Sequence, residues 1–147
     1  MKNNEMLKIA IGSDHRGFVQ KEYIKNHYSS CQWIDVGTHD TQRTDYPIFA
    51  NKVVKLLLTK QADYGILLCA SGGGMAIAAN RYKNIYAVVV WNNEIAQQAK
   101  SEDNANIMVI PSDFVSAEDV VAMIEIWLAT QFKGGRYAER VKMLNEI

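Results

Sequence analysis

Short, mostly apolar runs alternate along the chain with longer segments in which apolar residues recur every three or four positions. The short runs have the length of β-strands, whereas the longer segments have the period of an amphipathic helix. Strands that are apolar at consecutive positions are typical of a parallel sheet buried on both faces. The expected strands are residues 8–13, 33–36, 66–69, 86–90 and 107–110. The pattern therefore predicts a doubly wound α/β sandwich around five parallel strands.

The segments with helical periodicity follow the predicted strands in turn. We expect helices at residues 18–28, 47–58, 75–80, 93–103, 116–128 and 136–147. The last helix has no further strand to precede, so it could pack outward against another subunit, with packing on its own sheet as the alternative. The residues that would suit a subunit interface are Trp127, Phe132, Val141, Met143 and Leu144.

Composition limits the class of protein. With 147 residues, 48% of them hydrophobic and 22% charged, the chain is expected to form a single domain over residues 1–147. Lysine plus arginine equals aspartate plus glutamate at 16 each, so no overall field favours nucleic acid or a membrane surface. Any site for an anion must therefore be local.

Targeting and metal signals are absent from the sequence. No apolar run approaches the roughly 20 residues that a membrane span requires, and residues 1–6 are too short and polar for a signal peptide. The cytoplasm is the expected compartment, and Cys31 and Cys69 are expected to remain reduced. The cysteines and histidines have no metal-ligand spacing, so no metal is predicted.

Two loops carry the candidate chemistry. In open α/β sheets, ligands bind beyond the carboxyl ends of the strands, where Ser13-Asp14-His15 and residues 69–74 are expected to lie. Three consecutive glycines at 72–74 precede a helical segment and would let successive backbone N–H groups converge on an anion, although a tight turn is the alternative. Neither a P-loop nor a dinucleotide fingerprint is present.

Single residues in these loops have ordinary explanations as well. Cys69 alone would be an inert buried thiol, but beside a loop of amides and a helix start its thiolate should be stabilised and its pKa lowered. Asp14 and His15 alone would be a helix cap and a surface imidazole. Arg136 and Arg140 are four residues apart on one helical face and could grip a phosphate, or simply be solvated charges.

Several ordered motifs together resemble the ribose-5-phosphate isomerase B family, which includes the galactose-6-phosphate isomerase subunits. The motifs lie at residues 11–18, 35–38, 43–47, 69–74, 78–81 and 134–141 and cover nearly the whole chain. The resemblance implies a Rossmann-like three-layer sandwich whose C-terminal helix serves in dimerisation. It also implies a homodimer or tetramer with shared active sites, and cofactor-free interconversion of ribose 5-phosphate and ribulose 5-phosphate through a cis-enediolate.

The resemblance also assigns roles to residues. Cys69 matches a base that moves a proton between C1 and C2, and another branch of the family uses a glutamate where Met75 stands. Ser71 matches a hydroxyl that relays the proton between O1 and O2. The remaining matches are amides from Ala70 through Gly72 and Gly73 to Gly74 as an anion hole, Asp14 and His15 as sugar and phosphate contacts, Tyr46 as a pocket wall, and Arg136 and Arg140 as phosphate ligands.

Two positions depart from the family pattern. Glu102-Asp103 replaces the common His-Asn, whose histidine is assigned to opening the furanose ring. A glutamate there favours a hexose phosphate, such as galactose 6-phosphate or allose 6-phosphate, as the alternative substrate. Asp113 stands where the family commonly has an arginine that reaches the phosphate, so Arg16, Arg43 or Lys133 would have to compensate. Since two polar contacts are altered, a non-catalytic sugar-phosphate-binding subunit is a further alternative.

Overall fold

Five strands and six helices alternate through residues 5–147, which are the residues that this computed structural model describes. The strands are β1 (Lys8–Ser13), β2 (Gln32–Asp35), β3 (Tyr64–Cys69), β4 (Ala87–Val89) and β5 (Ile107–Pro111). The helices are α1 (Phe18–His27), α2 (Tyr46–Leu58), α3 (Gly73–Ala79), α4 (Asn93–Ser101), α5 (Ala117–Ala129) and α6 (Arg136–Leu144). The expectation for the chain start falls mostly on residues 1–4, outside the described part.

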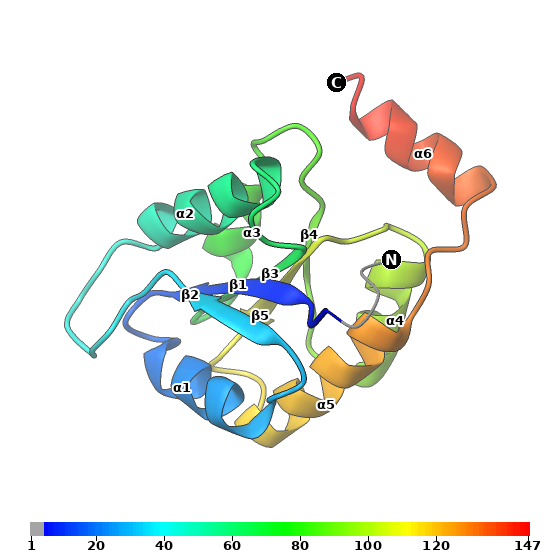
Figure 1. The fold of residues 1–147 in the computed structure, drawn as a ribbon. Helices are drawn as coiled ribbons and strands as arrows, with labels where there is room; N and C mark the ends of the chain where they lie inside the picture. The colour runs from blue at the N-terminus through cyan, green and yellow to red at the C-terminus, as the bar shows by residue number, and fades with distance from the viewer. Residues whose placement is uncertain (1–4) are drawn as a thin grey trace.

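The strands form one parallel sheet in the order β2-β1-β3-β5-β4 (Figure 1). Helices α2 and α3 cover one face, and α1, α4 and α5 cover the other. The predicted three-layer α/β architecture is therefore confirmed. The chain leaves β1 toward β2 on one side and returns to β3 on the other, so a crevice is expected where the carboxyl ends of β1 and β3 meet.

The core explains why the strands are apolar at consecutive positions. Ile9 and Ile11 pack into the cluster beneath α1 and α5. Ala10, which lies between them in the sequence, points to the other face and packs into the cluster beneath α2. Both faces of the central strands exclude water, so apolar side chains are favoured at consecutive positions there. Trp127 is also fully buried in the first cluster, edge-on to Tyr64 with ring centroids 5.1 Å apart. The prediction that Trp127 suits a subunit interface was wrong, because α5 faces its own sheet.

Side-chain caps set the starts of α4 and α5. The Asn92 side chain accepts a hydrogen bond from the backbone N–H of Ile95 at the start of α4, and the Ser116 hydroxyl accepts one from Asp119 at the start of α5. Both arrangements satisfy backbone donors that a first helical turn leaves unpaired. The fourth helix ends at Ser101, two residues earlier than predicted, and β4 is shorter than its apolar run.

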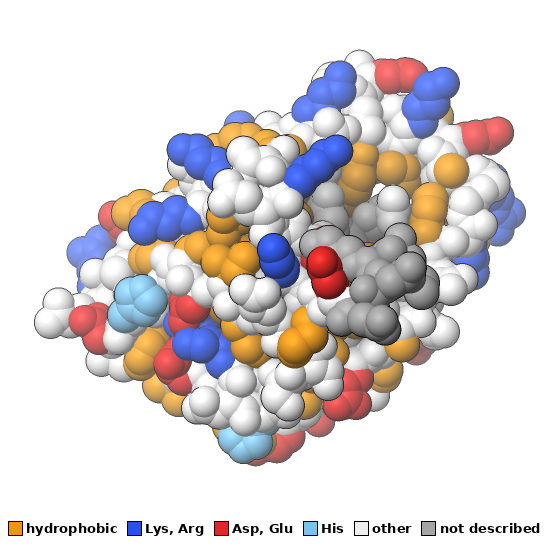
Figure 2. All heavy atoms as spheres, in the orientation of Figure 1, with side chains coloured by type: hydrophobic (Ala, Val, Ile, Leu, Met, Phe, Trp, Pro, Cys, Tyr) orange, Lys and Arg blue, Asp and Glu red, His pale blue; other side chains and the backbone are white. Residues whose placement is uncertain are grey.

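Helix α6 extends away from the three-layer body (Figure 1). Gly134 and Gly135, with φ of +69° and +54°, turn the chain outward before it begins. None of its residues is buried, and the side chains of Met143 and Leu144 are largely exposed. Figure 2 shows acidic and basic side chains over this helix and a hollow between it and the body. Within residues 5–147, no helix has the length and apolar character to cross a membrane.

Candidate active site

Three loops meet at the carboxyl edge of the sheet. The backbone N–H of Asp14, after β1, donates to the Leu68 carbonyl of β3 at 3.2 Å. After β5, the N–H groups of Ser112 and Asp113 donate to the carbonyls of Cys69 and Ala70 at 2.9 and 3.0 Å. These bonds hold the loops after β1 and β5 against the end of β3. Cys69 therefore ends the strand around which the three loops meet.

The loop after β2 supports the loop after β1. The Asp35 carboxylate accepts from Lys21 at 2.6 Å, from Lys25 at 2.7 Å and from the Gly37 N–H at 2.8 Å. Burial alone would raise the pKa of Asp35, but these donors outweigh it and lower that pKa. The Gly37 carbonyl in turn accepts from the Ser13 N–H at 2.8 Å. An ionised Asp35 thus fixes the backbone that leads into Asp14.

Asp14 and His15 are held by the turns that follow β1. Asp14 is buried, and its Oδ1 accepts from the N–H groups of Arg16 and Gly17 at 2.9 and 3.1 Å. The His15 Nδ1 accepts from the Thr44 N–H at 3.2 Å, so in neutral His15 the Nε2 atom carries the proton. The imidazole therefore presents an N–H donor on its other side. Thr44 lies in a motif that sequence analysis singled out without giving this residue a role.

Cys69 is a buried thiol at the end of β3. Burial raises its pKa, and the nearby Asp14 carboxylate adds to the rise. Backbone N–H groups of Met75, Gly72 and Ser71 donate to the sulfur and oppose the shift without cancelling it. The predicted lowering of this pKa was wrong, because removal from water outweighs the three amides. The amides nevertheless gather around the thiol, as the glycine loop indicated.

The glycine loop needs its glycines for different reasons. Gly72 has φ of +80°, which side chains other than glycine rarely adopt. Gly74 lies under the Tyr46 ring, and a Cβ atom there would approach the ring to 2.6 Å. The Gly73 N–H donates to the Ser71 hydroxyl at 3.3 Å. Tyr46 at the start of α2 thus lies against the glycine loop.

Four predicted site residues lie elsewhere in this chain. Glu102 and Asp103 follow α4 and precede β5, at the amino edge of a parallel sheet whose carboxyl edge carries Cys69. Arg136 and Arg140 lie on the protruding α6, where Arg136 donates to the Tyr137 hydroxyl at 3.1 Å. The structure therefore brings Asp14, His15, Tyr46 and the 69–74 loop to one edge of the sheet. It does not bring these four residues to them within one chain.

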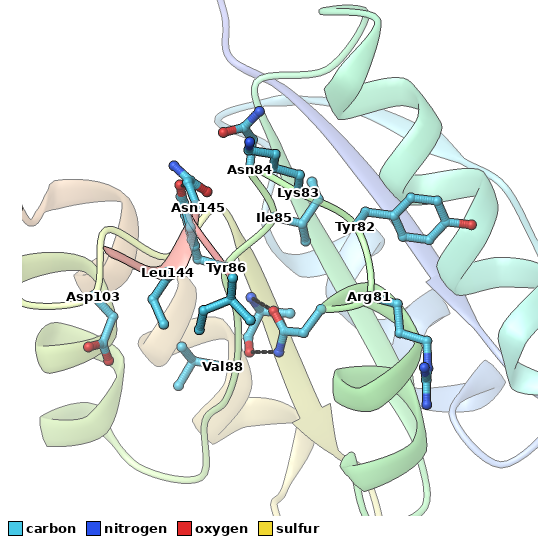
Figure 3. A pocket seen from close by; sticks show the side chains of 13 residues that line it. Arg81, Tyr82, Lys83, Asn84, Ile85, Tyr86, Val88, Asp103, Leu144 and Asn145 are labelled. Carbon is cyan, nitrogen blue, oxygen red and sulfur yellow. Dashed lines mark hydrogen bonds between the residues drawn. The ribbon is translucent and has the colours of Figure 1, made fainter. Parts of the chain in front are cut away.

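A hollow lies at the amino edge of the sheet. It has a volume of about 560 Å³ and is enclosed by residues 80–88, Asp103 and the end of α6 (Figure 3). The Tyr86 hydroxyl donates to Asn145 at 2.9 Å and ties α6 to the body beside it. Apart from Asp103, none of the predicted site residues lines this hollow. Burial and the neighbouring Glu102 charge raise the pKa of Asp103.

The described residues contain neither a disulfide nor a metal-binding cluster. Cys31 and Cys69 are both free and buried, and burial raises the pKa of Cys31 to about 12. Within residues 5–147, no three histidine, cysteine, aspartate or glutamate side chains gather as metal ligands would. The groups gathered at the carboxyl edge of the sheet are a thiol, a carboxylate, an imidazole and backbone amides.

Known proteins share both the sequence and the fold. A family model described as Ribose/Galactose Isomerase matches residues 9–144. The chain is 37% identical to ribose-5-phosphate isomerase B of Escherichia coli (strain K12) over 97% of each chain. It superposes with a TM-score of 0.94 on the crystal structure of a ribose 5-phosphate isomerase from Thermotoga maritima, at 42% identity, covering 96% of this chain and 99% of that one.

A solved structure with a bound sugar phosphate is also similar. Ribose-5-phosphate isomerase B from Mycoplasma genitalium, crystallised with ribulose-5-phosphate, matches with a TM-score of 0.90 and 31% identity over 97% of each chain.

Proposed function

The chain belongs to the ribose/galactose isomerase family, and we propose that it interconverts ribose 5-phosphate and ribulose 5-phosphate without a cofactor. The observation that carries this proposal is the position of Cys69. It ends the central strand among three backbone N–H donors, in a chain that matches the family over residues 9–144. An aldose–ketose isomerase needs a base beside donors that stabilise an enediolate, and this edge of the sheet offers both kinds of group.

In the proposed reaction, the Cys69 thiolate removes the proton from C2 of the open-chain aldose. The electron pair of the broken C2–H bond forms the C1–C2 double bond of a cis-enediolate, and the Cys69 thiol, whose proton exchanges with solvent, then protonates C1 to give the ketose. The Ser71 hydroxyl relays a proton between O2 and O1. Amides from Ala70 to Gly74 face the developing oxyanion, where a single fixed donor contributes about 3 kcal/mol in a well-measured enzyme.

The raised pKa of Cys69 fits a base that must attack a carbon acid. Burial makes the thiolate scarce at neutral pH, but each thiolate is then more basic than an exposed one. The three N–H donors at the sulfur limit how far the pKa rises. The His15 Nε2–H supplies a donor for the phosphate or a sugar hydroxyl, and the Asp14 carboxylate supplies an acceptor for a sugar hydroxyl.

We also propose that active sites are shared between two subunits of a homodimer or tetramer. Arg136 and Arg140 are exposed on α6, the helix that leaves the body, whereas Cys69 lies at the carboxyl edge of the sheet. On the same helix, Met143 and Leu144 are exposed, as expected of a helix that packs on another subunit. In such an assembly, these arginines would hold the phosphate of a substrate bound at the neighbouring Cys69.

A hexose phosphate is the second candidate substrate, and Glu102 favours it. The carboxylate is partly exposed and lies 3.7 Å from the Lys133 ammonium. As a base for ring opening it is less well matched to neutral pH than an imidazole. Replacement by histidine should raise the ratio of ribose 5-phosphate to galactose 6-phosphate turnover. An unchanged ratio in Glu102→His and Glu102→Gln would remove the support for a hexose.

The direct test is turnover by the purified chain alone. Ribose 5-phosphate, allose 6-phosphate and galactose 6-phosphate are supplied in turn, and proton NMR in deuterated water follows exchange at C2. Isomerisation with exchange is expected for the first substrate, and Cys69→Ala should abolish it while keeping the fold. Binding without turnover by the wild-type chain would instead support the non-catalytic subunit.

A further inference from the structure

Arg16 and Asp113 form an ion pair between two loops of the candidate site. The Nη2 atom of Arg16 donates to Oδ2 of Asp113 at 2.5 Å. The two residues are 97 positions apart in the chain. Arg16 follows β1 and Asp113 follows β5, and these two strands flank β3 in the sheet. The ion pair therefore spans the edge of the sheet at which β3 ends in Cys69.

Both partners are anchored to the catalytic loops through their backbones. The Arg16 N–H donates to the Asp14 carboxylate at 2.9 Å, and the Asp113 N–H donates to the Ala70 carbonyl at 3.0 Å. Arg16 is therefore held at its backbone by Asp14 and at its guanidinium by Asp113, and both of these residues hydrogen-bond to residues next to Cys69 or in its loop. Its side chain remains 53% exposed, so a ligand at this edge can reach it.

The pair contributes little to stability, because an ion pair this exposed is worth at most about 1 kcal/mol. Its larger effect is on orientation. A guanidinium has five N–H donors in a rigid fork, and the contact with Asp113 uses one Nη2 donor. The remaining donors suit the geometry of a phosphate, which an arginine can grip with two parallel bonds.

Other cations are less well placed in the described chain. Lys133 lies beside Glu102 at the amino edge of the sheet, and the arginines of α6 lie outside the body. Arg43 precedes Thr44, whose N–H donates to His15. Within residues 5–147, the structure gives the Arg43 side chain no hydrogen bond or ion pair. Arg16 is thus a cation whose hydrogen bonds attach it to the loops around Cys69.

We propose that Arg16, oriented by Asp113, binds the phosphate group of the sugar phosphate at the Cys69 site of its own chain. This inference rests on the proposed function for the identity of the ligand. It assigns to position 16 the charge that Asp113 cannot supply, and it makes Asp113 a positioning residue for Arg16. Asp113, whose charge would otherwise repel a phosphate, is neutralised by the guanidinium that it holds.

The test compares Arg16→Met with Arg43→Met, two variants that each remove one guanidinium near this edge. Two readouts are measured: the KM for ribose 5-phosphate, and the rise in Tm caused by inorganic phosphate. For Arg16→Met we expect KM to rise roughly tenfold or more and the phosphate-induced rise in Tm to shrink, as loss of a charge-assisted bond predicts. Arg43→Met should match the wild type in both readouts.

Two further variants separate binding from a mere link between loops. Arg16→Lys keeps the charge and should recover part of the phosphate effect, whereas a structural link would be lost to the same extent in both substitutions. The double variant Arg16→Met/Asp113→Arg places a cation in the loop after β5 instead of the loop after β1. This variant should restore phosphate binding. Unchanged phosphate binding in Arg16→Met, or a loss in Arg43→Met instead, would overturn the proposal.

The phosphate readout does not depend on turnover. If the wild-type chain isomerises none of the sugar phosphates, the proposed function fails, but the Tm shift by inorganic phosphate still decides the role of Arg16. If the wild type is active and Arg16→Met leaves both readouts unchanged, the proposed function stands and this inference fails.

Discussion

The ring of Tyr46 lies directly against Gly74, so that a Cβ atom built on the glycine would lie 2.6 Å from the tyrosine Cζ. This contact joins the first turn of α2 to the glycine loop after β3. We expect Gly74→Ala to displace the ring, which is 38% exposed and can move toward solvent, so the free energy of unfolding should fall by about 1 kcal/mol, the lower end of the cost of overpacking. Chemical denaturation at fixed protein concentration measures this loss.

Gly73→Ala is the matched control for that substitution. The nearest atom to its added Cβ is the Ser71 hydroxyl at 3.6 Å, an ordinary contact, so stability should change little. In a Tyr46→Ala background the clash at Gly74 is removed, and Gly74→Ala should no longer destabilise. An equal cost of Gly74→Ala in both backgrounds would show that the ring is not its cause.

The pH dependence of catalysis should follow the raised pKa of Cys69. Because kcat/KM reports the free enzyme, and the thiol is mostly protonated at neutral pH, kcat/KM should rise about tenfold per pH unit from neutrality toward the ordinary cysteine pKa and beyond. Rates for ribose 5-phosphate between pH 6 and 9.5 test this. A plateau already reached at neutral pH would contradict it.

Subunit mixing tests the shared site. Cys69→Ala and Arg136→Ala homo-oligomers should each have low activity, the second through a raised KM, because a remote phosphate contact also positions the reacting carbons. When the two variants are unfolded and refolded together, mixed oligomers contain a site with both residues intact, and activity should return. Activity that stays at the sum of the two parents would refute sharing.

Lys100 should make stability depend on pH. Its side chain is buried, with the ammonium 4.1 Å from the Tyr64 ring centroid and 4.6 Å from that of Trp127, and burial lowers its pKa to about 8. In the unfolded chain this pKa is about 10.4, so between these values the unfolded state binds more protons. The contribution of Lys100 to stability therefore rises as the pH rises through that window.

Comparison with Lys100→Met isolates this group, since other titrations are common to both proteins. The free energy of unfolding of the wild type, minus that of the variant, should increase as the pH rises from 7.5 to 10. Urea denaturation at several pH values measures both. A constant difference between the two proteins over this range would show that Lys100 does not titrate as burial indicates.

Local patterns were sufficient for most of the architecture. The apolar runs at residues 8–13 and 107–110 became β1 and β5 because strands covered on both faces are apolar at every position. Parallel strands place their carboxyl ends at one edge, so the meeting of Asp14 with the end of β3 also followed from the order of elements. Trp127 was misplaced, since an apolar residue near a chain end is equally suited to a core or an interface.

What the sequence by itself determined is the alternation of strands and helices and the two loops that carry chemistry, because periodicity and turn residues are local. Only the tertiary structure decided the pKa of Cys69, since burial by distant elements outweighs the amides of its own loop. The pairing of Arg16 with Asp113 likewise depends on the sheet order, which places β1 and β5 on either side of β3. Glu102 lies at the opposite edge for the same reason: the parallel direction of β5 separates the residues before it from those after it.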